Sequence, residues 1–180
     1  MILLLTGTPG TGKTTISRLL SDKLNARLVA VNQLVDQKHL YTGLDPDKHY
    51  KIVDIQALIQ EMDEAAQNYR DSEDWLILEG HLSHYYQPAD LVVVLRASPP
   101  ILEERLKNRK WKPEKVKENL EAEALDICAW EAGDIHGALA QEVDTTHKMP
   151  QDVVKTIIEI IRGERTSPLG GVNFLDQMDL

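Results

Sequence analysis

The stretch Gly7-Thr8-Pro9-Gly10-Thr11-Gly12-Lys13-Thr14, close to the start of the chain, decides the fold. It is a complete G-x-x-x-x-G-K-[ST] phosphate-binding loop, in which glycines let successive backbone N–H groups surround phosphate oxygens. Lys13 is expected to reach the outer phosphates, and the Thr14 hydroxyl is expected to ligate Mg²⁺. The pattern therefore predicts that a nucleoside triphosphate is the first ligand to consider.

The residues on both sides of the loop fit the strand-loop-helix setting that the motif requires. The apolar run Ile2-Leu3-Leu4-Leu5 leads into the loop and predicts a strand. After the loop, apolar residues recur at helical spacing, at Ile16, Leu19, Leu20 and Leu24. An accidental glycine-rich turn is the alternative, and this context argues against it.

Length limits the class of protein. A chain of 180 residues suffices for one α/β domain with its own core but is too short for two large domains. No apolar run approaches the roughly 20 residues that a membrane span needs. The start of the chain lacks the charged region and cleavage site of a signal peptide. We therefore expect a cytoplasmic protein without membrane contact.

The cysteine content and the net charge further limit the class of protein and its expected partners. Cys128 is the one cysteine, which argues against a disulfide framework and a four-cysteine zinc site, and it is interpreted as a buried helix residue. The net charge of −9 and the pI near 5.1 predict a surface that repels nucleic acid. A basic protein partner fits this surface better than naked RNA.

Strand and helix patterns alternate along the rest of the chain. Short apolar runs predict strands at 27–31, 75–78, 91–95 and, as a candidate last strand, 141–145. Helical spacing predicts helices at 33–39 with Asn32 as N-cap, at 55–62, at 102–106, at 113–127 as one long helix, and at 153–161. The stretch 40–51 is polar and rich in turn residues, and with the helix after it predicts a small helical insertion.

This alternation predicts the fold class. We expect an α/β domain over residues 1–163, with a parallel sheet covered by helices on both faces and ligands bound beyond the carboxyl ends of the strands. Periodicity is lost from Gly163 onward, so residues 164–180 are expected to form a mobile tail.

Glu79-Gly80-His81 ends the run at 75–78 and is the next candidate for chemistry. At the mouth of the phosphate site, Glu79 is predicted to hold the Mg²⁺ shell or to orient the attacking group. A solvated strand-end glutamate is the alternative. His81 is predicted to position a nucleophile or to sense the γ-phosphate, with a structural histidine as the alternative.

Basic residues around Pro113 are candidates for the cations that phosphoryl transfer needs when a site closes. Arg105, Arg109 and Lys110 lie where one predicted helix gives way to the next. A guanidinium matches phosphate better than an ammonium does, and a solvated helix end is the alternative for each arginine. The remaining interpretations are surface charges for Lys107, Lys110 and Lys112, a packing anchor for Trp111, and core positions for Trp75 and Trp130.

With these motifs the chain resembles the small adenylate-kinase-like NTPases of the adenylate kinase isoenzyme 6 type, which occur in archaea as "putative adenylate kinases" and are associated with maturation of the small ribosomal subunit. The resemblance covers about residues 2–160. Its matching stretches are 4–15, Tyr41-x-Gly43-x-Asp45, Val92-x-Val94-Leu95-Arg96, Arg105-Leu106-x-x-Arg109 and Glu118-Asn119-x-x-Ala122-Glu123.

The resemblance implies a P-loop NTPase fold like that of the nucleoside monophosphate kinases, with a short lid. It implies a monophosphate-binding region at about 30–53 and the lid at about 108–118. It also implies which residues bind ATP, namely Gly10, Gly12, Lys13, Thr14, Thr15, Arg109 and Lys148. The role of Lys148 rests on the resemblance alone, since its own context predicts a surface lysine.

Three departures from the family pattern concern the substrate site. The usual strand-end Asp-x-His is Glu79-Gly80-His81 here, and an acidic cluster is reduced to Asp54-Ile55-Gln56. No arginine occurs between Arg27 and Arg70, although an acceptor phosphate favours a bidentate cation. The candidates for this role are Arg96, Lys38 and Lys51.

These observations lead to three functional hypotheses. The first is a broad-specificity nucleoside monophosphate kinase that transfers the γ-phosphoryl group of Mg·ATP to AMP and also hydrolyses ATP. Its catalytic residues would be Lys13, Glu79, His81 and Arg109, with Thr14 and Glu79 at the metal. The second is an ATP-switched assembly factor that binds a basic ribosomal protein of the small subunit. The third is a kinase of another small acceptor.

Overall fold

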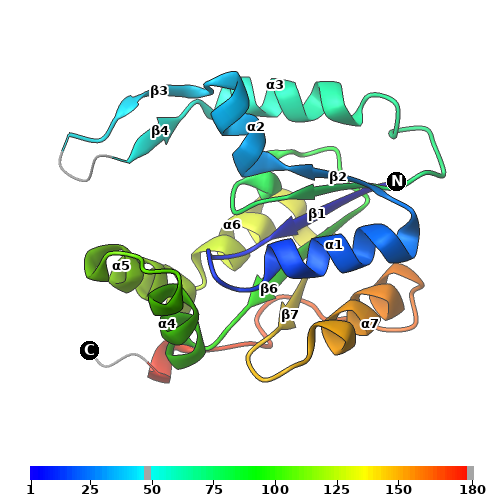
Figure 1. Cartoon of the computed structure of the whole chain (residues 1–180). Helices are drawn as coiled ribbons and strands as arrows, with labels where there is room; N and C mark the ends of the chain where they lie inside the picture. Colours follow the sequence, from blue (N-terminus) through cyan, green and yellow to red (C-terminus); the bar gives the residue numbers. More distant parts are fainter. Residues whose placement is uncertain (47–49, 178–180) are drawn as a thin grey trace.

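The core of the molecule is a five-stranded parallel sheet, seen in a computed structural model (Figure 1). The structure describes residues 1–46 and 50–177. All neighbouring strands of the sheet pair in parallel, which confirms the predicted architecture. The strand order is β2 (Arg27–Ala30), β5 (Leu76–Glu79), β1 (Ile2–Thr6), β6 (Leu91–Arg96) and β7 (Ala140–Asp144).

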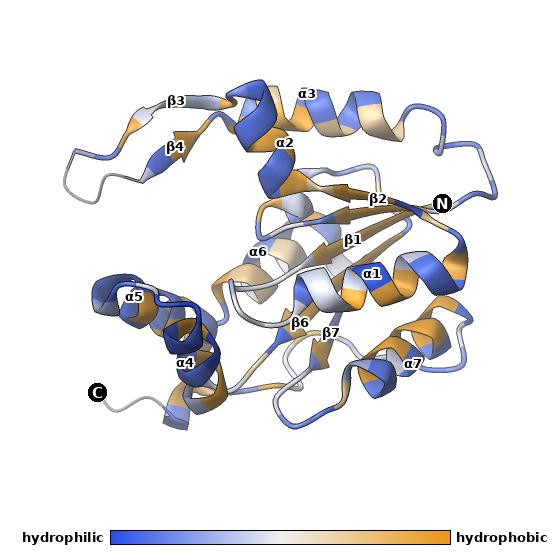
Figure 2. Ribbon diagram, in the orientation of Figure 1, coloured by the Kyte–Doolittle hydropathy of each residue, from blue (hydrophilic) through white to orange (hydrophobic). Residues whose placement is uncertain are grey.

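Helices cover both faces of this sheet, because successive side chains of each strand point to opposite faces. Leu4 and Leu78 pack beneath one group of helices, and Leu5 and Leu95 pack beneath the other. The central strands β1, β5 and β6 are hydrophobic over most of their length, whereas the helices are hydrophobic on one side (Figure 2). The first group is α2 (Val31–Lys38), α3 (Ile55–Ala66) and α6 (Ile127–His136), and the second is α1 (Lys13–Leu24) and α7 (Pro150–Ile161).

Two smaller units extend beyond the carboxyl ends of the central strands (Figure 1). One is an antiparallel hairpin of β3 (Tyr41–Leu44) and β4 (Lys51–Val53). The other is the helix pair α4 (Pro99–Asn108) and α5 (Pro113–Ala124), which has its own core around Leu106. Residues 47–49 of the expected monophosphate-binding region lie outside the described residues.

Several expectations about individual elements are wrong. The turn-rich stretch at 40–51 contains the strands β3 and β4, which pair with each other and were not expected, whereas the helix expected after it is present as α3. The predicted helix at 113–127 is two helices, since the backbone at Asp126 takes the left-handed conformation, with a φ of 56°, and α6 turns onto the sheet. Asn32 is not an N-cap, because α2 begins at Val31. Trp130 is 69% exposed and therefore is not a core residue.

The C-terminal segment lies along β7. The Glu142 N–H donates to the Ser167 carbonyl at 2.8 Å, and the Arg96 guanidinium lies 5.5 Å from the ring of the buried Phe174. We expected a mobile tail over 164–180; through residue 177 the structure gives this segment a packed path, and residues 178–180 lie outside the described residues. Among the residues described, no helix has the length and apolarity to cross a membrane.

Candidate active site

The phosphate-binding loop joins β1 to α1 through backbone that only glycine accepts without strain. Gly7 and Gly10 have φ angles of 133° and 97°. A Cβ on Gly7 would lie 2.3 Å from the Leu95 carbonyl oxygen, and a Cβ on Gly10 would lie 2.6 Å from Leu102 Cδ1. The loop is therefore pressed against β6 and α4, and its path depends on both glycines.

Side chains from two distant segments hold the outer half of this loop. Thr145 Oγ1 lies 2.9 Å from both the Thr11 and the Arg96 carbonyl oxygens and donates to one at a time. The Arg105 guanidinium donates to the Gly10 carbonyl at 3.4 Å and to the Thr145 carbonyl at 3.1 Å. Arg105 thus braces the loop from α4, which differs from the expected mobile cation of a closing lid.

Lys13 opens α1 and is buried at the base of the loop. Its Nζ donates to the Gly7 carbonyl at 2.7 Å and to the Thr8 carbonyl at 3.0 Å. Burial lowers the pKa of Lys13, and the nearby Glu79 carboxylate partly opposes the shift. The ammonium group is thus held at the loop, close to the position where the motif predicts the outer phosphates.

Glu79 and Thr14 meet beside the loop. The parallel register pairs Glu79 with Leu5, so the end of β5 stands next to the end of β1. Thr14 Oγ1 donates to Glu79 Oε1 at 3.4 Å, and Glu79 is 8% exposed, which argues against a solvated strand-end glutamate. Burial raises the pKa of Glu79, and Lys13 and Thr14 oppose the rise. A hydroxyl and a carboxylate oxygen fit Mg²⁺, which takes its remaining ligands from phosphates and water.

His81 lies two residues beyond Glu79 and is partly buried at the same edge of the sheet. Burial lowers the pKa of His81 to about 4, and the positive charge of Lys13 adds to the shift. The imidazole is therefore neutral at pH 7. It can donate one hydrogen bond and accept another, but it cannot contribute a positive charge to phosphate binding.

A cavity of about 850 Å³ opens from the phosphate-binding loop toward the hairpin and the α4–α5 pair. It brings together most of the predicted site residues, Gly10, Gly12, Lys13, Thr14, Thr15, Glu79, His81 and Arg109. It does not include Lys148, which is exposed in the loop before α7 and lines a separate groove along β7.

The far wall of this cavity comes from residues to which the sequence analysis assigned no role. Lys115, Glu118, Asn119 and Ala122 of α5 line it, while Glu123 of the same helix points away into the protein. Their spacing of three, four and seven residues is that of one helix face, and this signal could have identified the wall. Further lining residues are Asp36, Tyr50, Lys51, Trp111, Cys128 and Glu131.

A buried polar chain connects the root of the loop to this wall. Thr6 Oγ1 lies 2.8 Å from His84 Nδ1, His84 Nε2 lies 3.1 Å from Glu131 Oε2, and the Tyr85 hydroxyl donates to Glu131 Oε1 at 3.2 Å. Burial lowers the pKa of His84, which is fully enclosed. A neutral His84 that carries its proton on Nε2 donates to Glu131 and accepts from Thr6, so this tautomer satisfies both contacts.

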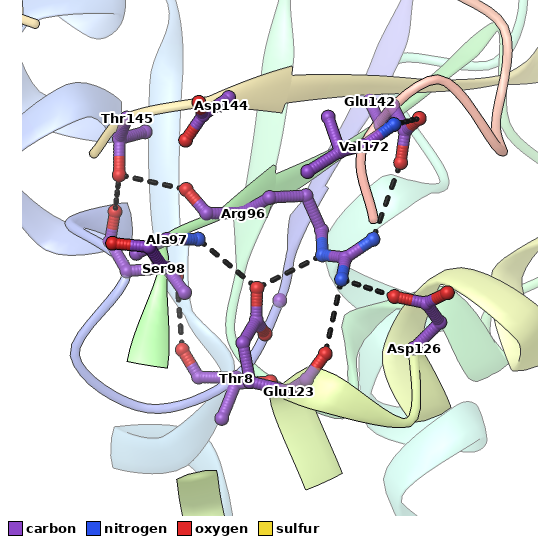
Figure 3. Close-up of polar contacts among 12 residues, drawn as sticks. Thr8, Arg96, Ala97, Ser98, Glu123, Asp126, Glu142, Asp144, Thr145 and Val172 are labelled. Atoms are coloured by element: carbon purple, nitrogen blue, oxygen red, sulfur yellow. Dashed lines mark hydrogen bonds and ion pairs between the residues drawn. The ribbon is translucent and has the colours of Figure 1, made fainter. Parts of the chain in front are cut away.

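Arg96 is not available to a ligand, which corrects one expectation for the acceptor phosphate. Its guanidinium is 1% exposed and is enclosed by carboxylates (Figure 3). It donates to Glu123 Oε1 at 2.9 Å, to Glu142 Oε2 at 3.2 Å and to Asp126 Oδ1. The cluster instead joins the end of β6 to the α5–α6 junction and to β7.

The two lysines proposed for the same role differ in position. Lys38 forms an ion pair with Glu61 at 3.1 Å and does not line the cavity. Lys51 lines the cavity, but its ammonium pairs with Asp36 Oδ1 at 2.6 Å, which raises the pKa of Lys51. Only one of the three expected cations therefore faces the cavity, and a carboxylate offsets its charge.

Comparisons with known proteins agree with this architecture. A family profile described as an AAA domain matches residues 3–126. The chain is 40% identical over 173 residues to a "putative adenylate kinase" of Methanothermobacter thermautotrophicus, with 96% of each protein covered. It is 37% identical over 179 residues to the protein of that name from Pyrococcus abyssi, covering 99% of this chain and 94% of the relative.

A solved structure, shikimate kinase from Bacteroides thetaiotaomicron, superposes with a TM-score of 0.57 at 17% identity, over 90% of this chain and 98% of that one. At this identity the likeness concerns the fold. The chain therefore has the α/β fold of the small P-loop kinases.

Proposed function

The chain belongs to the family of the archaeal "putative adenylate kinases", and from this premise we propose that it is a nucleoside monophosphate kinase. In the proposed reaction the γ-phosphoryl group of ATP passes to AMP, which gives two molecules of ADP. The observation that carries the proposal is the continuity of the phosphate-binding loop with a cavity of about 850 Å³. That volume offers room for an acceptor next to the triphosphate.

The donor triphosphate is proposed to bind along the loop and the start of α1. Backbone N–H groups of the loop and the N-terminus of α1 supply positive ends of dipoles, and Lys13 supplies a full charge. Because charge spreads over the transferring phosphoryl group, these fixed donors lower the barrier without rearranging. Gly10, Gly12 and Thr15 line the cavity at this end, in agreement with this role.

Glu79 and Thr14 are proposed to hold Mg²⁺ beside the phosphates. Bound Mg²⁺ supplies charge neutralisation between the outer phosphates. The buried Glu79 carboxylate, 3.4 Å from Thr14 Oγ1, would orient the water shell of the ion or the attacking group. Burial raises the pKa of Glu79, while Lys13 and Thr14 favour its ionised form, which would hold this water shell.

His81 and Arg109 are also proposed to act on the transferring group. Neutral His81 can donate a hydrogen bond to the acceptor phosphate or accept one from an attacking water, since burial lowers its pKa to about 4. Arg109 caps the C-terminal end of α4 and lines the cavity, so its guanidinium can approach the phosphates when the α4–α5 pair closes. The same arrangement, with water as acceptor, would hydrolyse ATP.

A second candidate function is the ATP-switched binding of a basic ribosomal protein. One surface feature favours it: Leu125, Ile127 and Trp130, at the start of α6 and the turn before it, are 56%, 40% and 69% exposed. The net charge of −9 would attract a basic partner to such a surface. In this case ATP turnover would time the release of the partner.

The proposals are separated by measuring ADP and AMP over time with Mg·ATP, in the presence and absence of AMP. AMP-dependent formation of two ADP for each ATP consumed supports the kinase, and CMP, GMP and UMP as acceptors test its breadth. A rate of phosphate release that does not depend on AMP, but rises when a basic ribosomal protein of the small subunit is added, supports the function as an assembly factor. Transfer to shikimate or another small alcohol instead of AMP would make the protein a kinase of a different acceptor.

A further inference from the structure

The acceptor side of the cavity needs a cation, and the sequence leaves few candidates. A nucleoside monophosphate carries a charged phosphate, yet no arginine occurs between Arg27 and Arg70. Among the described residues, the lysines and arginines that line the cavity are Lys13, Lys51, Arg109 and Lys115. Since Lys13 and Arg109 serve the donor in the proposed function, the choice for the acceptor lies between Lys51 and Lys115.

Lys51 is poorly suited to this role. Its ammonium lies 2.6 Å from Asp36 Oδ1 and 4.8 Å from the centre of the Tyr41 ring. A phosphate approaching Lys51 would meet the Asp36 carboxylate as well, so attraction and repulsion largely cancel. Lys51 could bind phosphate only after leaving this pair.

Lys115 is held differently. Its Nζ lies 4.3 Å from the centre of the Trp111 ring and 5.1 Å from the centre of the Tyr50 ring. Aromatic faces attract a cation through their quadrupoles but carry no net charge. Lys115 is therefore positioned by its neighbours while its full positive charge stays available to an anion in the cavity.

The two rings belong to opposite sides of the cavity. Trp111 lies in the turn between α4 and α5, and Tyr50 directly precedes β4 of the hairpin. The Lys115 ammonium thus bridges the α4–α5 pair and the hairpin. The ammonium also lies close enough to His81, just beyond the end of β5, for its charge to help lower the pKa of that imidazole.

We propose that Lys115 binds the phosphate of the acceptor nucleotide, with Trp111 and Tyr50 holding its ammonium across the cavity. This inference rests on the proposed kinase function and names the residue that replaces the missing arginine. A lysine is a compact charge with three rotatable donors, whereas arginine offers a fixed planar fork. Recognition would therefore depend on the acceptor phosphate more than on a fixed orientation of its base, in keeping with broad acceptor specificity.

The test compares Lys115→Ala and Lys115→Arg with Lys117→Ala. Lys117 is a matched control because it lies on α5, is strongly exposed and pairs with Glu121 instead of the cavity. Loss of a charge-assisted hydrogen bond to phosphate should raise the KM for AMP about 10- to 100-fold in Lys115→Ala. The KM for ATP should stay within about twofold, and Lys115→Arg should recover most of the loss, because it keeps the charge.

Binding of AMP and adenosine, followed by calorimetry in the absence of ATP, isolates the phosphate contribution. We expect Lys115→Ala to weaken AMP binding toward the level of adenosine and to leave adenosine binding unchanged. An equal loss for both ligands would overturn the inference, since it would indicate a structural role or a contact with the base.

The outcome also separates this inference from the proposed function. Wild-type protein that forms no ADP from AMP contradicts the kinase itself. Wild-type protein that does so, together with an unchanged KM for AMP in Lys115→Ala, contradicts only the role of Lys115. A rise in the KM for ATP instead of AMP would assign Lys115 to the donor and would equally overturn the inference.

Discussion

The two halves of the cavity, which the proposed function assigns to the donor and to the acceptor, are built in different ways. The donor half, the phosphate-binding loop with Glu79, is fixed by backbone: glycines press it against β6 and α4, and carbonyl oxygens receive Lys13 and Arg105. The acceptor half consists of side chains from α2, the hairpin, the α4–α5 turn, α5 and α6. Lys51 joins the hairpin to α2 by an ion pair, and Lys115 contacts the rings of Trp111 and Tyr50.

This difference indicates how each half responds to substitution. Fixed backbone donors stabilise the charge that develops during transfer, so changes in the donor half should lower turnover. Side chains that are partly exposed set how tightly the second ligand binds, so changes in the acceptor half should raise its KM. The buried Arg96 cluster does not line the cavity and joins the end of β6, beside the loop, to the end of α5.

The largest effect should come from Arg96→Met, which removes the cation that joins the end of β6 to α5 and β7. Glu123 and Glu142, each 2% exposed, would keep buried carboxylates that still accept a backbone N–H, from Ala97 and Val172, but have lost their cation. We expect the free energy of unfolding to fall by about 3–5 kcal/mol, measured by urea denaturation. Arg162→Met, at the exposed end of α7, is the control and should change stability by less than about 0.5 kcal/mol.

Arg96→Lys tests whether the charge alone, or also the shape of the guanidinium, stabilises this cluster. Lysine keeps a charge but cannot reproduce the planar fork that contacts three carboxylates, so it should recover only part of the stability. Full stability of Arg96→Met with a raised KM for AMP would contradict the structural role of Arg96. It would instead support a role for Arg96 in binding the acceptor phosphate.

Lys13→Ala should give the next largest effect, and it tests the donor half. The ammonium is a full positive charge fixed at the base of the loop, so its loss should lower turnover by about 10²- to 10³-fold, both with AMP and with water as acceptor. Steady-state kinetics measure the effect. Lys23→Ala, exposed near the end of the same helix, should retain normal rates; a comparable loss there would point to unfolding of α1.

The donor half could be predicted from the sequence because its chemistry is local. The loop residues are consecutive, and the strand before them and the helix after them leave strong apolar patterns. Glu79 could be placed as well, because the carboxyl ends of parallel strands meet at one edge of the sheet. The break at Asp126 left no such signal, since the apolar spacing continues from α5 into α6 across the left-handed residue.

The acceptor half could be predicted only as a region, about 30–53 with Lys51, because its residues come from segments far apart in the chain. Lys115, Tyr50 and Glu131 meet only after the hairpin, α5 and α6 are in place. The expectation for Arg96 failed for a related reason: a charged residue at the end of a buried strand resembles a ligand, and only the fold reveals its carboxylate partners.

Glu79→Gln should give a smaller effect than Lys13→Ala, because glutamine keeps the shape and an oxygen acceptor but loses the charge. We expect turnover to fall about 10- to 100-fold and the affinity for ATP to change much less. Full turnover in Glu79→Gln would contradict the metal-side role of Glu79. Glu73→Gln, exposed before β5, serves as the control.

The smallest effect at neutral pH concerns His81. Its pKa is about 4 in the folded protein, against 6.5 for an ordinary histidine, so it stays neutral above pH 6.5 and contributes no pH dependence there. Between these two values the unfolded chain binds the proton and the folded protein does not, so stability is lost as the pH falls. An NMR titration should give a His81 midpoint near 4.

His81→Gln isolates this contribution from that of His84, whose pKa burial also lowers. The variant should lose less stability than wild type between pH 6.5 and 4, because one titrating group has been removed. A midpoint near 6.5 would mean that His81 is solvated and can become cationic beside the phosphates. His81 would then carry a positive charge that depends on pH. It would behave as an adjustable side chain, although it lies beside the fixed donors of the loop.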